Sequence, residues 1–261
     1  MGSSLVGGVN FYYLPGKQIT ETNINKKNIE SRSSESAGEP LKPMEGTVKE
    51  VTQIDSILTS NNWQTKLFKY NDATEENIIQ MENKEAKSIL HLATHGYAFP
   101  KFEFKYTTIK RSSLSYNFSK NPMVRSGLIL AGGNWAWTGS DTLIKLGAEQ
   151  NAILTALEVS QLNLKKTKLV VLSACETGLG MSKGSEGTFG LKRGFKIAGV
   201  EQMIVSLWDV PDEATTELMT LFYSDLTKSL NPVTSFSKAQ REMRNRYPFI
   251  PIYWAGFVLV R

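Results

Sequence analysis

The stretch KLVVLSACETGLG, residues 168–180, changes character at its centre, where an apolar run gives way to a loop that contains glycine. The run from Leu169 to Ser173 is continuously apolar until its last residue, which is typical of a strand buried on both faces. Cys175, the only cysteine of the chain, follows directly after this strand. In parallel α/β sheets, sites form at the carboxyl ends of the strands. The sequence therefore places its single thiol where a site is expected.

Strands and helices alternate on both sides of this stretch. Strands are predicted at residues 5–14, 63–70, 88–96, 125–132, 168–174, 202–208 and 254–260. Helices are predicted at residues 46–58, 72–81, 150–164, 188–198, 213–230 and 235–246, and Asp72 stands three residues before Glu75 in the pattern of a helix N-cap. Apolar strands separated by helices predict an α/β fold with a mostly parallel sheet covered on both faces.

The composition is that of one globular domain spanning residues 1–261, with 41% hydrophobic and 21% charged residues. Residues 15–44 are polar and contain almost no large apolar side chain, which predicts a flexible loop. The opening MGSS resembles an expression scar, and the first strand begins directly after it. We therefore expect this chain to be the C-terminal portion of a longer protein.

Charge and hydropathy exclude several classes of function. The formal net charge is +5, but the lysines are scattered and form no dense basic run, so we expect no direct nucleic-acid binding. No apolar run approaches the roughly 18 residues of a membrane span, so no membrane partner is expected. A single cysteine forms no internal disulfide, which favours a reducing, cytoplasmic setting.

The two histidines of the chain, His91 and His95, have different expected roles. A metal site is rejected, because HLATH lacks the glutamate of the HExxH pattern and its neighbours predict a strand. His91 lies inside that strand and is predicted to be a hydrogen-bonded core residue. His95 lies at the strand end, before Gly96, and is predicted to be exposed at the edge of the sheet.

Neighbouring parallel strands would bring Cys175 and His95 to one cleft. An imidazole titrates near neutral pH, so His95 can take the thiol proton and later protonate a leaving amine. Cys175 would attack a carbonyl and form a thioester. The backbone N–H groups of Gly96 and Cys175 would stabilise the oxyanion. Taken alone, one cysteine and one histidine are a weak signal, because a lone cysteine is usually a small buried apolar residue.

The segments ILHLATHG and LVVLSACETGLG, in this order, resemble the signature of the CHAT family of caspase-like cysteine peptidases, which belongs with caspases, separases and gingipains. The similarity extends over residues 46–260 and includes SEGTFGLKRGFKIAGVEQMIVSLWDVPDEAT and the ending PIYWAGFVLV. It departs from the family pattern at Asn151, Ala152 and Ile250. The resemblance implies a caspase-like three-layer sandwich with a mostly parallel six-stranded sheet, helices on both faces and a final antiparallel strand.

By this resemblance, the chain is a cysteine endopeptidase of protein substrates, with His95 and Cys175 as the catalytic dyad and no cofactor or metal. Its relatives are often joined to tetratricopeptide repeats or sensor modules, which act as activating partners, and bacterial examples occur in defence systems. The acidic candidates for binding a basic side chain before the scissile bond are Glu176, Glu186, Asp209 and Asp212.

Several alternatives stay open. Asp212 precedes a predicted helix and fits an N-cap equally well. Trp135 and Trp137, in a glycine-rich segment, fit a substrate cleft and plain packing equally. For the whole chain, the alternative is a catalytically silent caspase-like scaffold that mediates protein–protein interaction, against which the intact dyad counts. A redox-sensing thiol fits less well, because Cys175 has no resolving partner.

Overall fold

The computed structural model describes residues 1–15, 40–84, 88–99, 121–146, 149–174 and 188–261. Within them, a six-stranded sheet forms the centre of the molecule, with the strand order β2-β1-β3-β7-β8-β9. Its strands are β1 (Gly2–Val9), β2 (Gln64–Tyr70), β3 (Ile89–Leu92), β7 (Leu169–Leu172), β8 (Gln202–Ser206) and β9 (Phe257–Val260). All pairs are parallel except β8–β9, so the expected final antiparallel strand is confirmed.

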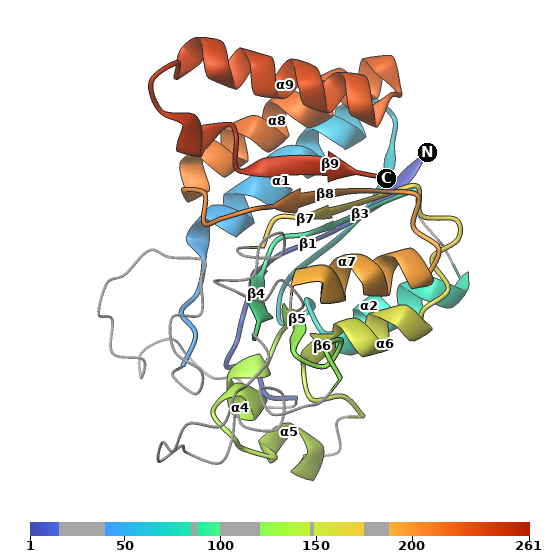
Figure 1. Cartoon of the computed structure of the whole chain (residues 1–261). Helices are drawn as coiled ribbons and strands as arrows, with labels where there is room; N and C mark the ends of the chain where they lie inside the picture. Colours follow the sequence, from blue (N-terminus) through green and yellow to red (C-terminus); the bar gives the residue numbers. More distant parts are fainter. Residues whose placement is uncertain (16–39, 85–87, 100–120, 147–148, 175–187) are drawn as a thin grey trace.

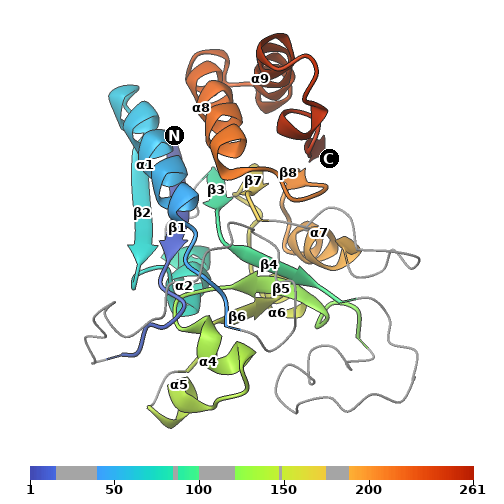
Figure 2. The same cartoon turned by 90° about the vertical axis from the view of Figure 1, so that its left-hand side faces the viewer.

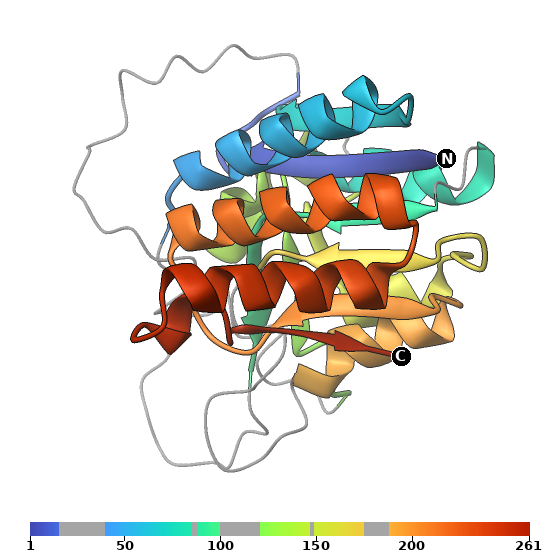
Figure 3. The ribbon, with the colours of Figure 1, turned by 90° about the horizontal axis from the view of Figure 1, so that it is seen from above.

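Helices cover both faces of this sheet and give three layers (Figure 1). One face carries α1 (Glu45–Ser60), α8 (Asp212–Ser229) and α9 (Pro232–Arg246), which lie side by side when seen from above (Figure 3). The other face carries α2 (Glu75–Lys84), α6 (Ala156–Gln161) and α7 (Thr188–Ile197). A 3₁₀ turn, Pro251–Tyr253, leads into β9. None of the helices in the described part of the chain is long and apolar enough to cross a bilayer.

Successive side chains of β7 point to opposite faces of the sheet, and each face is covered by an apolar core. Leu169 and Val171 pack into the core beneath α1, α8 and α9, whereas Val170 and Leu172 pack into the core on the opposite face. Strand residues that alternate between two apolar cores must be apolar at every position. This is why the sequence shows a continuous run there, and the whole strand is buried.

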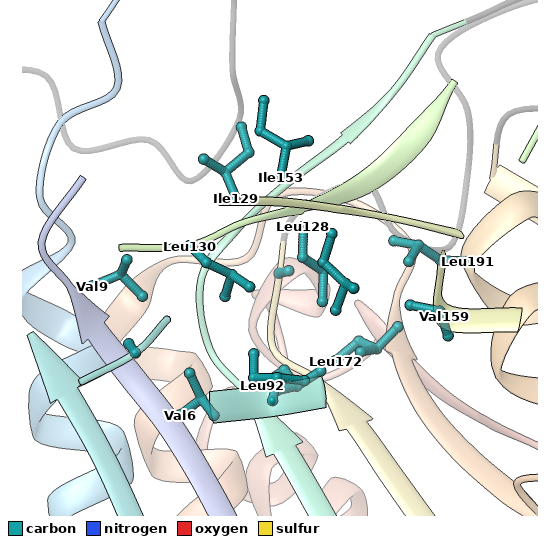
Figure 4. Packing of buried hydrophobic residues seen from close by; sticks show 14 of the residues in the cluster. Val6, Val9, Leu92, Leu128, Ile129, Leu130, Ile153, Val159, Leu172 and Leu191 are labelled. Atoms are coloured by element: carbon teal, nitrogen blue, oxygen red, sulfur yellow. The ribbon is translucent and has the colours of Figure 1, made fainter. Parts of the chain in front are cut away.

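A second, three-stranded antiparallel sheet lies below the first, with the order β4-β5-β6 (Figure 2). It consists of β4 (His95–Ala98), β5 (Ser126–Ile129) and β6 (Ile153–Thr155), and the short helices α4 (Gly133–Trp137) and α5 (Thr142–Lys145) follow β5. Figure 4 shows Leu128 of β5 pointing toward Leu92 and Leu172 of the main sheet. The two sheets therefore share one apolar core.

The structure corrects four local predictions. The first strand is β1, Gly2–Val9, and not residues 5–14, so Gly2, Ser3 and Ser4 of the MGSS opening belong to the sheet. The stretch 88–96 is not one strand, because β3 ends at Leu92 and a new strand of the other sheet begins at His95. The predicted helix 150–164 begins with strand β6, and its helical part starts only at Ala156. The N-cap of α2 is Thr74, whose Oγ1 accepts a hydrogen bond from Asn77 N at 3.2 Å, and not Asp72.

Candidate active site

The register of the main sheet brings two chemistry-bearing segments together. Leu92, the last residue of β3, pairs with Leu172, the last residue of β7. The ladder continues for one more step, because Ser173 N donates to Leu92 O at 2.9 Å. His95 comes three residues after Leu92, and Cys175 comes three residues after Leu172. His95 and the segment that leads to Cys175 thus both follow the carboxyl ends of two adjacent parallel strands.

The end of this second segment is fixed by the neighbouring strand. Ser206, the last residue of β8, donates a hydrogen bond from its Oγ to the carbonyl oxygen of Ala174. Ala174 and Ser206 are both buried. Cys175 follows Ala174 in the chain and lies outside the described residues, as do Glu176 and Glu186. The prediction that Cys175 faces His95 therefore stays a prediction.

His95 is held by main-chain and aromatic contacts. Its Nε2 lies 3.0 Å from the carbonyl oxygen of Lys42, and its ring centroid lies 5.0 Å from that of Phe11. A carbonyl oxygen only accepts hydrogen bonds, so Nε2 carries the proton. In the neutral ring, Nδ1 is then the basic nitrogen, which is the state that a general base requires.

The predicted exposure of His95 is wrong, because only 2% of the residue is accessible. One contact of the ring, the Lys42 carbonyl, comes from a part of the chain that the sequence predicted to be a flexible loop. Leu41 and Met44 within residues 40–44 are buried, and Leu41 is hydrogen-bonded to Asn134 at both its N–H and its carbonyl group. This segment carries the Lys42 carbonyl to the histidine.

The N–H of Gly96 takes no part in the β4–β5 ladder, which leaves its predicted role as an oxyanion donor a prediction. Phe99 N donates to Arg125 O, so bonded pairs of the β4–β5 ladder fall at Phe99, Tyr97 and His95. Antiparallel ladders alternate bonded and non-bonded pairs, which directs the N–H of Gly96 away from β5. Since β4 is the edge strand of its sheet, that N–H points out of the sheet.

His91 is a core residue, as predicted. It is fully buried, and both ring nitrogens are hydrogen-bonded, Nδ1 to Tyr223 Oη and Nε2 to Glu50 Oε1, each at 3.0 Å. Glu50 also accepts a hydrogen bond from Ser173 Oγ at 3.1 Å. The pKa of Tyr223 is raised well above its ordinary value, first by burial and then by the negative charge of Glu50. Ser173, one member of this network, lies two residues before Cys175 in the chain.

Sequence reasoning missed Glu50, Asn134 and Lys42. Glu50 could have been found from the sequence, because position 50 lies on the same apolar face of the predicted helix as Val51 and Ile54, where a charged residue is unexpected. Asn134 and the Lys42 carbonyl gave no such signal, since one lies in an irregular glycine-rich segment and the other is a main-chain atom.

Asp209 and Asp212 follow the carboxyl end of β8, and His95 follows the carboxyl end of the parallel strand β3; both aspartates are partly exposed. Asp212 is the first residue of α8 and not its N-cap, which is Pro211. Its carboxylate lies against the start of α1, because a Cβ on Gly46 would come within 2.1 Å of its Oδ2. A narrow recess beside Ala174 is lined by Ser206 and Trp208 among others, and neither aspartate lines it.

The two tryptophans of the glycine-rich segment differ in burial. Trp137 is 1% exposed and stacks on Phe99 with ring centroids 5.9 Å apart, which makes it a core residue. Trp135 is partly buried and donates from Nε1 to Tyr13 O at 3.2 Å. Among the described residues, no group of three or more potential metal ligands occurs.

A family model described as the CHAT domain matches residues 17–261. Tetratricopeptide repeat protein 28 is 34% identical to this chain over 112 residues in Homo sapiens and 35% over 109 residues in Mus musculus. These matches cover 42% and 41% of the chain but only 4% of each relative.

Two solved structures share the fold. The Arg-specific cysteine proteinase gingipain R aligns with a TM-score of 0.52, at 12% identity, over 99% of this chain and 45% of its own. The complex of Porphyromonas gingivalis RgpB pro- and mature domains gives a TM-score of 0.50, also at 12% identity, over 99% and 46%. At this identity, the likeness shows a caspase-like fold, and the chain spans less than half of each neighbour.

Proposed function

Because the chain belongs to the CHAT domain family, we propose that it is a cysteine endopeptidase that cleaves protein substrates with Cys175 and His95. The observation that carries this proposal is the tautomer of His95. The Lys42 carbonyl holds the proton on Nε2 and leaves Nδ1 to act as the base, at the edge where the Cys175 segment leaves β7. His91 has the same tautomer within the core, and His95 differs from it because it follows the carboxyl end of β3, beside the strand that leads to Cys175.

The reaction follows from these groups. Nδ1 of His95 takes the Sγ proton of Cys175, and the thiolate attacks the carbonyl carbon of the scissile peptide bond. The N–H groups of Gly96 and Cys175 stabilise the resulting oxyanion. The C–N bond breaks as the imidazolium gives its Nδ1 proton to the leaving amine. Water, deprotonated by the same nitrogen, then hydrolyses the thioester and restores the thiol.

Substrate selection rests on acidic side chains at this edge. A carboxylate recognises an arginine or lysine side chain by charge-assisted hydrogen bonds. Asp209 and Asp212 follow the carboxyl end of β8 and are partly exposed, which supports this role, while Glu176 and Glu186 remain candidates on sequence grounds alone. Gingipain R, which shares the fold, is an Arg-specific proteinase, and this supports a basic preference here.

A scaffold is the second candidate function, and the burial of His95 favours it. With 2% of the residue accessible, a polypeptide must displace part of the cover before it reaches the ring. The matched relatives are named for tetratricopeptide repeats, which supports a repeat-containing or sensor partner that activates the site or simply binds the fold. A cytoplasmic setting and a role in bacterial defence stay predictions.

The test uses the single thiol. The wild type, Cys175→Ala and His95→Ala are incubated with a mixed peptide library, and the products are identified by mass spectrometry. We expect cleavage by the wild type only, with a basic residue before the cleaved bond. Cleavage that persists in Cys175→Ala contradicts the peptidase proposal. Absence of cleavage in all three, also with a tetratricopeptide partner added, supports the scaffold.

A further inference from the structure

Asn134 makes two hydrogen bonds to one residue that lies far away in the sequence. Its Oδ1 accepts from Leu41 N at 2.7 Å, and its Nδ2 donates to Leu41 O at 2.9 Å. Asn134 is 1% exposed and lies in the short helix α4. A side-chain amide that satisfies both main-chain groups of one residue fixes its position and orientation, as a neighbouring strand would.

The same asparagine also contacts Phe11, whose ring packs against His95. Its backbone N–H donates to Phe11 O at 3.0 Å, and the Phe11 ring lies against the His95 ring. Leu41 directly precedes Lys42, whose carbonyl oxygen accepts the Nε2 proton. Asn134 therefore holds both supports of the histidine, the acceptor at Nε2 and the ring that packs on its face.

We propose that Asn134 is a positioning residue that sets the tautomer of His95 through Leu41 and the Lys42 carbonyl. This inference rests on the proposed function. A displaced carbonyl would leave Nε2 without its acceptor, so the ring would rotate or carry its proton on Nδ1. In that tautomer, Nδ1 cannot accept the thiol proton, and the dyad fails although every reacting group is still present.

A purely structural role would give a different result. Removal of a buried amide lowers stability whatever its function, because Leu41 loses two partners. A positioning role additionally lowers kcat while KM stays nearly constant, and it slows alkylation of the thiol. Because the chain has one cysteine, its rate of reaction with iodoacetamide reports the reactivity of Cys175 alone and needs no substrate.

The experiment compares Asn134→Ala, Asn134→Asp, His95→Ala and Glu45→Ala with the wild type, each shown to be folded by circular dichroism. Asn134→Asp keeps the acceptor for Leu41 N and loses the donor to Leu41 O. It therefore decides the question if Asn134→Ala does not fold. Glu45→Ala is the control, because Glu45 is exposed at the start of α1, three residues after Lys42.

We expect both Asn134 variants to lose about 10- to 100-fold in kcat and in alkylation rate at pH 7, with KM little changed and Glu45→Ala like the wild type. Folded Asn134 variants that stay within about twofold of the wild type in both rates overturn the inference. If the wild type cleaves nothing but its alkylation rate depends on His95 and Asn134, the positioning role stands and the peptidase proposal falls. If alkylation depends on neither residue, both fall.

Discussion

Glu50 Oε1 lies 3.0 Å from His91 Nε2, with both side chains completely buried. Tyr223 and Ser173 complete the network, so it joins α1, β3, α8 and the end of β7. With the Nε2 proton donated to Glu50, Nδ1 accepts from the Tyr223 hydroxyl, and Ser173 donates to the second carboxylate oxygen. Every polar atom of this buried set then has a partner, which is the condition for its retention in a core.

Glu50→Ala is expected to lower the free energy of unfolding by about 3 kcal/mol, because it leaves the His91 N–H and the Ser173 hydroxyl without their acceptor. Urea denaturation followed by circular dichroism measures the loss. Glu45→Ala, an exposed site in the first turn of the same helix, is the control and should change little. Equal effects of the two substitutions would contradict the importance of the network.

Glu75 makes stability depend on pH. Burial, and then the nearby carboxylate of Glu158, raise its pKa from 4.5 to about 8, while the amides of Ala152 and Ile153 oppose this shift only in part. The folded state therefore holds a proton that the unfolded chain releases above pH 4.5. The unfolding free energy should fall as pH rises from about 5 to 8, by about 1 kcal/mol per pH unit, and level off above 8.

Glu75→Gln should remove this dependence and be more stable than the wild type at pH 8. Urea unfolding of both proteins at pH 5, 6, 7, 8 and 9 measures it. Asp72→Asn, at an exposed site just before α2, is the control and should retain the wild-type slope. A wild-type curve without a slope between pH 5 and 8 would show that Glu75 is ionised in the folded protein.

Gly194 permits the close packing of α7 on α6. A Cβ at this position would lie 2.5 Å from the carbonyl oxygen of Ala156, which is backbone and cannot move aside alone. Gly194→Ala should therefore destabilise the fold by about 1 to 3 kcal/mol, although alanine has the higher helix propensity. Arg193→Ala, at the adjacent exposed position, gives the baseline in thermal unfolding. A Gly194→Ala protein more stable than the wild type would mean that α7 can move away from α6 without loss of stability.

Substrate preference provides a test of the acidic residues beyond β8. Of Asp209→Asn and Asp212→Asn, the variant that removes the carboxylate bound to the substrate arginine should lower kcat/KM about tenfold for substrates with arginine before the scissile bond. Cleavage after leucine should change little. Glu213→Gln, exposed on the first turn of α8, is the control. If neither aspartate matters, the same assay moves to Glu176→Gln and Glu186→Gln.

The main sheet was predictable from sequence, and the small sheet was not. The apolar run of β7 and the amphipathic period of α1 carry strong local signals, because burial on two faces or on one stripe fixes the residue pattern. The sequence also predicts a strand at β5, but a strand pattern does not indicate to which of two sheets the strand belongs. Thr94 and His95 gave no sign that the chain changes sheets between them.

For the site, the place of His95 was predictable and its support was not. His95 comes three residues after the end of β3, close to the strand end that the sequence indicated. The contact of His95 with Lys42 was missed, because residues 40–44 end a polar stretch whose composition hid the buried Leu41 and Met44. Long-range hydrogen bonds such as those between Asn134 and Leu41 produce no periodic pattern in the sequence.

The acceptor for His95 has a consequence for how this protein can vary. A carbonyl oxygen exists at position 42 whatever amino acid the codon specifies, so comparisons of aligned residues would rate the position as unconstrained. Selection would act instead on the number of residues between Leu41 and α1, since an insertion or deletion there would present a different oxygen, or none, to the imidazole.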